Sequence, residues 1–166
     1  FLFDELCWKK KKTKVWYVGG LSKVRGISEI IAAIEHVGDD VELMIGGSFG
    51  VDSYKKEIES LDCSRVTFMG FLDRESVKSL YRNSIAGLVS LHPIPNYLDA
   101  LPVKMFEYMS AGIPVISSNF PLWKEIIEGN NCGLAVDPKD PKQISSAIEK
   151  LLSDEKQAEE MGKNGR

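Results

Sequence analysis

The sequence predicts an α/β fold, a doubly wound, Rossmann-like sheet of six parallel strands. Short apolar runs alternate with amphipathic helical patterns in units of about 25 residues, as in strand–helix–strand units with right-handed crossovers. The apolar runs are continuous rather than alternating, which is typical of strands covered by helices on both faces. The first three runs also end at glycine, at Gly19-Gly20, Gly46-Gly47 and Gly70.

The first half of the chain predicts three strands and three helices. The strands are the apolar runs at 15–18, 41–45 and 66–69. Ser22 and Ser28 are candidate caps for the first helix, and Asp73 is a candidate cap for the third. Each helix shows apolar residues at helical spacing. In chain order these are Ile27, Ile30, Ile31 and Ile34; Tyr54, Ile58 and Leu61; and Val77, Leu80 and Tyr81.

The second half predicts three more strand–helix pairs, with strands at 85–91, 115–116 and 133–136. A proline-containing loop follows the first of these, and a helix is expected from about 102 to 111. Pro102 suits its first position, and Gly112 with Pro114 ends it. The last two helices carry Leu122, Trp123, Ile126 and Ile127, ending at Gly129, and Ile144, Ala147, Ile148, Leu151 and Leu152.

Composition narrows the functional class. The net charge of −3 argues against nucleic acid as a partner. No apolar run reaches the roughly 18 residues of a membrane span. Three cysteines at irregular spacing form neither a disulfide framework nor a zinc pattern, so a reducing cytoplasmic setting is expected.

Residues 1–14 are expected to be a linker that precedes a domain at 15–166. Lys9–Lys12 fit a solvated linker, with a membrane-surface or anion-binding patch as the alternative. The start lacks the features of a signal peptide, and both ends suggest a piece of a longer protein.

Ligands of doubly wound sheets sit beyond the carboxyl ends of the strands, so the loops there are the candidate site. Gly19 and Gly20 follow the first strand and allow a backbone to approach phosphate, while Arg25 adds a forked cation. The spacing matches neither the dinucleotide-binding glycine motif nor the P-loop. Gly46-Gly47 forms a second such loop, either a simple turn or a ligand contact.

The richest stretch runs from His92 to Gly112. Asp99 and Glu107 are eight positions apart, about 12 Å if both lay on one helix, so they are expected to hold two ends of an extended ligand. Lys104 lies three residues before Glu107 and can share its face. A surface ion contact between Lys104 and Glu107 is the structural alternative.

These residues resemble the group 1 (family 4) retaining glycosyltransferases of GT-B architecture, specifically their C-terminal, donor-binding half. The similarity spans Val15 to Leu152, and the Leu-Pro-x-Lys-x-Phe-Glu-Tyr block is its most specific part. The matching segments are Tyr17–Gly26, Phe68–Leu72 and Leu101–Ile116, continuing through Glu125 to Gly133–Pro138.

The resemblance implies that a nucleotide-sugar donor, UDP-linked by default, is bound here and its sugar transferred with retention. The family's two acids fall on Asp99, near the sugar, and Glu107, on the ribose; these are the expected catalytic residues. No cofactor and no metal are implied. The expected donor-binding residues are Gly19, Gly20, Arg25, Gly47, His92, Val103, Lys104 and Glu107.

The resemblance also implies partners and a setting. An N-terminal domain absent from this sequence would bind the acceptor, a glycan or a lipid-linked glycan of cell-surface polysaccharide synthesis, so the isolated chain is expected to be inactive. The full-length enzyme would be a hexosyl- or N-acetylhexosaminyltransferase, cytoplasmic or peripheral to the inner membrane face.

The sequence departs from the family at three positions. Gly20 stands where an arginine is common, Asp99 is one methylene shorter than the usual glutamate, and Pro102 removes an N–H near the diphosphate. Two alternatives remain: a GT-B relative such as a nucleotide-sugar epimerase, and a non-catalytic α/β binding module.

Overall fold

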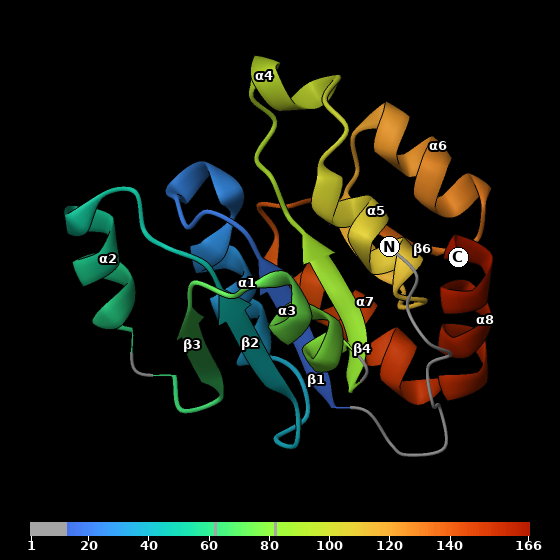
Figure 1. Ribbon diagram of the computed structural model, residues 1–166, viewed down its shortest axis with the longest axis horizontal. Helices are drawn as coiled ribbons and strands as arrows, with labels where there is room; N and C mark the ends of the chain where they lie inside the picture. Colours follow the sequence, from blue (N-terminus) through green and yellow to red (C-terminus); the bar gives the residue numbers. More distant parts are fainter. Residues whose placement is uncertain (1–12, 62, 82) are drawn as a thin grey trace.

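Six parallel strands form a single sheet in the order β3-β2-β1-β4-β5-β6 (Figure 1). The computed structural model describes residues 13–61, 63–81 and 83–166. The predicted fold class is therefore confirmed, and all six predicted strands are present. Their bounds are β1 Lys14–Val18, β2 Glu42–Gly46, β3 Val66–Gly70, β4 Ser84–Val89, β5 Val115–Ser118 and β6 Gly133–Val136.

Helices cover both faces of the sheet and build a core on each. Residues of α1, α2, α7 and α8 pack on one face, and residues of α3, α5 and α6 pack on the other. The continuous apolar runs of β1 and β4 face both cores, as the sequence predicted. The helices are α1 Ile27–Ile34, α2 Asp52–Glu59, α3 Arg74–Tyr81, α4 Pro95–Leu98, α5 Val103–Ser110, α6 Pro121–Gly129, α7 Pro141–Ser153 and α8 Glu155–Gly165, with a 3₁₀ turn η1 at Lys23–Arg25.

The structure corrects several local predictions. The first helix is not capped by Ser22 or Ser28: Gly26 stands at its N-cap with φ of 68°, a left-handed backbone suited to glycine. Pro102 is not in its helix but precedes it in extended conformation, and α5 begins at Val103. Asp73 does cap α3, because its carboxylate accepts a hydrogen bond from the Ser76 N–H at 2.8 Å.

Three elements were not predicted from sequence. The turn η1 and helix α4 have only one turn each, too short for a periodic pattern. Helix α8 follows α7 directly, and Asp154 separates them by capping α8 through the Gln157 N–H at 3.0 Å. The predicted Leu61 lies beyond the end of α2 and is exposed.

Strands β1 and β4 are neighbours although two strands, β2 and β3, separate them in sequence order, so the strand order reverses between them. Helix α5 is fixed at this reversal by Tyr108, which is fully buried. Its hydroxyl accepts from the Val18 N–H at 3.0 Å and lies 3.4 Å from the Trp16 carbonyl, to which it donates. Its ring lies over Gly87 of β4, where a Cβ would overlap the ring.

Gly87→Ala should therefore lower the free energy of unfolding by about 1–3 kcal/mol, because the added methyl forces Tyr108 out of its place. Urea unfolding would measure it. Gly129→Ala is the matched control, since a Cβ there meets no described atom within 4 Å, and should stay within about 0.5 kcal/mol. Equal midpoints for the two variants would contradict this packing.

Candidate functional site

A cavity of about 440 Å³ opens at the carboxyl ends of β1 and β4, where the strand order reverses. This is the place at which ligands bind in doubly wound sheets. The wall combines the end of β1, the start of α5 and the segment between β4 and α5. Its lining includes Gly19, Arg25, Tyr97, Lys104, Glu107 and Trp123.

Lys104 is the most unusual side chain in this cavity. It is only 8% exposed, and within the described chain its Nζ has no hydrogen-bond partner. The Nζ sits 3.8 Å from the centre of the Tyr17 ring, a cation–π contact. Burial, and next the charge of Arg25, lower the pKa of Lys104 to about 7, while Glu107 acts in the opposite direction. The surface ion contact between Lys104 and Glu107 is therefore wrong: the lysine points inward, unpaired.

Arg25 and Lys104 meet around the backbone of Gly19. Gly19 has φ of 147°, and a Cβ there would stand 3.2 Å from Lys104 Nζ and 3.8 Å from Arg25 Nη1. The absence of a side chain thus leaves two cations facing a bare stretch of backbone. Such a pairing of nearby positive charges is unfavourable without an anion between them.

Tyr17 supports this arrangement from beneath. Its hydroxyl donates a hydrogen bond to the Gly20 carbonyl at 2.8 Å, which fixes the turn after β1. Burial raises the pKa of Tyr17 to about 12, so the hydroxyl keeps its proton and remains a donor at neutral pH. Its ring also carries the contact with Lys104.

The turn η1 delivers Arg25 into the cavity. Gly26 directly after it has φ of 68° and packs so tightly on Ser90 that a Cβ would overlap the Ser90 carbonyl. This close approach brings η1 down onto the end of β4. Arg25 then lies 5.9 Å from the ring centre of Tyr97, which faces it from α4.

The two acids predicted from sequence occupy different positions. Glu107 lines the cavity from α5 and is partly buried. Asp99 is the C-cap residue of α4 and is exposed. It does not line the cavity, although its neighbour Ala100 does. The two carboxylates are therefore on separate elements, α4 and α5.

The remaining predicted residues divide between wall and support. Val103 lines the mouth and is 72% exposed. Gly20 is exposed beside Gly19. Gly47, with φ of 144°, packs directly on the Gly19 carbonyl, which leaves no room for a side chain. Gly47 therefore supports the loop at Gly19 from the neighbouring strand end.

His92 turns away from the cavity. Its Nε2 lies 3.0 Å from Glu29 Oε1 on α1, and its backbone N–H donates to the Val24 carbonyl at 2.8 Å. It is not among the cavity-lining residues. Both contacts join the end of β4 to η1 and α1, so the geometry gives His92 a structural role in holding the turn that bears Arg25.

Sequence reasoning missed three aromatic residues at the cavity: Tyr97 and Trp123, which line it, and Tyr17, which lies beneath Lys104. Tyr17 and Trp123 lie in apolar patterns that predict core, and both are indeed fully buried. Tyr97 lies in the Pro-rich loop, where an aromatic residue beside Asp99 was the available signal.

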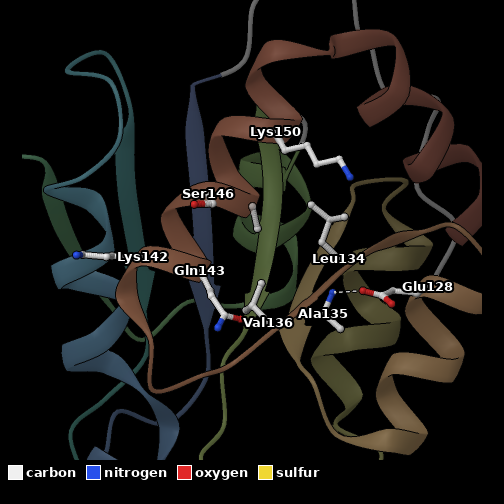
Figure 2. Close-up of a pocket in the computed structure, with 9 residues that line it drawn as sticks. Glu128, Leu134, Ala135, Val136, Lys142, Gln143, Ser146 and Lys150 are labelled. Atoms are coloured by element: carbon white, nitrogen blue, oxygen red, sulfur yellow. Dashed lines mark hydrogen bonds between the residues drawn. The ribbon is translucent and has the colours of Figure 1, made fainter.

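A second hollow, of about 350 Å³, lies beside the edge strand β6 between α6 and α7 (Figure 2). Glu128 accepts a hydrogen bond from the Ala135 N–H at 3.2 Å, and Gln143 accepts one from the Asp137 N–H at 3.0 Å. Ala135 belongs to the edge strand β6, and Asp137 directly follows it. These side chains satisfy that edge, which is a structural task, since unpaired edges invite association.

The described residues lack both a metal-binding cluster and a membrane-spanning helix. Residues 13–61, 63–81 and 83–166 contain no group of three or more His, Cys, Asp or Glu side chains arranged to hold a metal ion. Over the same ranges no helix has the length and apolarity needed to cross a membrane. Lys9–Lys12, Cys7 and most of the expected linker lie outside the described residues.

The whole chain, residues 1–166, matches the family described as glycosyl transferases group 1. The chain belongs to this family. Among curated relatives, spore coat protein SA of Bacillus subtilis (strain 168) is 32% identical over 167 residues, covering 93% of this chain and 43% of that protein. Alpha-D-kanosaminyltransferase of Streptomyces kanamyceticus is 27% identical over 158 residues, covering 90% and 39%. The group 1 chain thus spans less than half the length of these relatives.

Solved structures share the fold of this group 1 chain. Sucrose-phosphate synthase from Thermosynechococcus elongatus has a TM-score of 0.80 at 28% identity, covering 93% of this chain and 39% of that one. HepE of Anabaena, solved in complex with UDP, has a TM-score of 0.81 at 20% identity, covering 93% and 43%. A C-terminal domain of a group 1 glycosyltransferase from Francisella tularensis (LpcC) has a TM-score of 0.76 at 25% identity, covering 95% and 84%. The fold is that of the C-terminal domain of GT-B glycosyltransferases.

Lys104→Met should raise the free energy of unfolding by about 1–3 kcal/mol at neutral pH, because it removes an uncompensated buried charge and keeps the volume. The folded-state pKa lies below that of the unfolded chain, so the unfolded chain binds more protons above pH 7. As pH rises from about 7 to about 9, the free energy of unfolding of the unmodified chain should therefore increase relative to that of Lys104→Met.

Urea unfolding of both proteins across this pH range would measure the effect. Lys55→Met is the control, since Lys55 is half exposed and forms a surface ion pair with Glu59. A variant at Lys104 less stable than the unmodified chain would show that the charge is compensated in the folded state.

Proposed function

We propose that this chain binds the nucleoside diphosphate part of a sugar donor, with the diphosphate between Arg25 and Lys104 over the backbone of Gly19. One observation carries the proposal. The buried, unpaired Lys104 lies near Arg25, and the residue between them at the end of β1 is Gly19, which has no side chain. An anion between the two cations relieves their repulsion and gives Lys104 the partner it lacks.

The rest of the donor extends along the wall in both directions. We propose that Glu107 accepts hydrogen bonds from the ribose hydroxyls, since it is the acid inside the cavity. Asp99, outside the cavity at the end of α4, is then left for the sugar. Gly20, Gly47 and Val103 shape the space by supplying backbone and a small apolar wall.

For the reaction, we propose transfer of the sugar from the nucleoside diphosphate to an acceptor hydroxyl with retention at the anomeric carbon. The bond that breaks leaves negative charge on the diphosphate. Arg25 and Lys104 are positioned before the reaction starts, and preorganised charge of this kind stabilises a developing anion most effectively. We expect these side chains to take the place of a divalent metal.

The whole enzyme is a further proposal, because the chain spans only 43% and 39% of the lengths of the two curated relatives above. We propose that a second α/β domain binds the acceptor, that residues 1–14 link the two, and that the chain alone binds donor without turning it over. A hexosyl or N-acetylhexosaminyl group and UDP are the expected donor parts.

The biological setting that we propose is the cytoplasmic side of cell-surface polysaccharide synthesis. Its support is family membership and a relative named for this role, the capsular polysaccharide biosynthesis glycosyltransferase CapM of Staphylococcus aureus, 26% identical over 155 residues. Peripheral attachment of the full-length enzyme to the membrane is part of this proposal.

Titration calorimetry with UDP and GDP should detect saturable, weak binding to one of them by the isolated chain. Glu107→Ala should weaken it by about tenfold, since a hydrogen bond to a charged group is worth about 1.5–3 kcal/mol. Asp99→Ala should change it by less than about twofold, because Asp99 faces the sugar. A folded chain that binds neither nucleotide would sink the proposal, and the reverse order of effects would show that the two acids have exchanged roles.

Donor affinity should increase as pH falls. Lys104, with a pKa of about 7, must be protonated to hold a diphosphate, and binding raises that pKa, so the complex takes up a proton. Affinity for UDP-glucose, or for GDP-mannose if guanine is the base, should rise roughly tenfold from about pH 8.5 to about pH 6.5. Lys104→Met should bind weakly with a flat profile; a flat profile in the unmodified chain would assign the phosphate to Arg25 alone.

A further inference from the structure

The segment from His92 to Pro102 forms one wall of the donor cavity and has little regular structure. It connects β4 to α5, and its only described helix is the single turn α4. Figure 1 shows α4 standing beyond the end of the sheet, away from the two cores. A segment of this kind needs specific contacts with the body of the domain to hold one position.

Contacts at three points hold this segment. At its start, the His92 N–H donates to the Val24 carbonyl. In the middle, the Tyr97 ring faces Arg25. Near its end, the indole N–H of Trp123 donates to the Ala100 carbonyl at 2.6 Å. The third contact lies one residue from Asp99, and it comes from α6, an element distant in sequence.

The side chain of Trp123 is held in one position by its neighbours. Its side chain is fully buried in the core formed by α3, α5 and α6. Its ring packs against Phe120, with ring centres 4.6 Å apart. Because neighbours fix the ring, the N–H points at Ala100 without further loss of side-chain entropy. The indole has one donor, and that donor is taken, so Trp123 offers no hydrogen bond to a ligand.

We infer that Trp123 is a positioning residue: by holding the Ala100 carbonyl, its indole N–H sets where Asp99 stands beside the donor cavity. The inference rests on the proposed function, since it matters only if Asp99 reads the sugar. If the inference is right, the sugar and the nucleotide contact two parts of the cavity wall that are held in place by different elements. Arg25, Lys104 and Glu107 stand on η1 and α5, while Asp99 depends on α6 through Trp123.

Trp123→Phe removes the N–H and keeps an aromatic ring in the core. It should weaken binding of the matching sugar form about five- to tenfold more than binding of the free nucleoside diphosphate, the range of one hydrogen bond. Calorimetry with UDP against UDP-glucose, or GDP against GDP-mannose, gives both numbers.

Trp16→Phe is the matched control. Trp16 is buried in the same core, but its indole N–H meets no acceptor in the part of the chain that the structure describes. This variant loses comparable packing and no hydrogen bond, so it should change neither affinity selectively. If Trp16→Phe produced the same selective loss, packing rather than the hydrogen bond would be responsible.

A double-mutant cycle distinguishes positioning from a general structural effect. In an Asp99→Ala background, Trp123→Phe should cause no further loss of sugar-dependent affinity, because the group that it positions is already absent. Ala100→Gly loosens the same segment without altering the core. It should cause a smaller loss of affinity for the nucleotide sugar, again relative to the free nucleoside diphosphate. It serves as the second variant if Trp123→Phe lowers folding yield.

The outcomes separate the two proposals. An unmodified chain that binds no nucleotide overturns the proposed function and this inference together. Nucleotide binding in the unmodified chain with no selective loss in Trp123→Phe, or with additive losses in the cycle, overturns only the role of Trp123.

Discussion

The arrangement of the site depends on the packing of one tyrosine. Tyr108 of α5 lies over Gly87 of β4, and its hydroxyl bridges the Trp16 carbonyl and the Val18 N–H of β1. These contacts clamp α5 across the two strands at which the strand order reverses. Because Glu107 precedes Tyr108 and Lys104 lies one turn earlier, the same clamp fixes both charged side chains in the wall of the cavity.

This rigidity explains how the fold keeps a lysine in an unfavourable place. Lys104 loses hydration on burial and has Arg25 rather than an acid as its strongest charged neighbour. A mobile helix would let the amine reach solvent, but α5 is held by a fully buried side chain. The large apolar cores on both faces offset the cost of this group, and functional sites are where such local costs are expected.

The supports of the site are distributed over the sheet. Gly47 packs on Gly19 from β2, Gly26 packs on Ser90 at the end of β4, and Trp123 reaches Ala100 from α6. The first two contacts are close approaches of two backbones, and the third is a single hydrogen bond. Each contact holds a different side of the cavity in place. The nucleotide and sugar parts of a donor would therefore meet walls that are supported independently.

The sequence by itself determined the sheet, the alternation of strands and helices, and the position of Arg25, Lys104 and Glu107 beyond the strand ends, because periodicity and local motifs depend on neighbouring residues. It did not determine η1, α4 or the cap of α1, which are too short or too irregular for a period to detect.

Only the tertiary structure decided which way the candidate side chains face. His92 turns to Glu29, Lys104 turns inward onto Tyr17, and Trp123 serves the loop at Ala100. Those contacts join residues from different elements, up to 87 positions apart for Lys104 and Tyr17. Burial and partner choice at such distances are set by how helices pack on the sheet, and no local pattern carries that information.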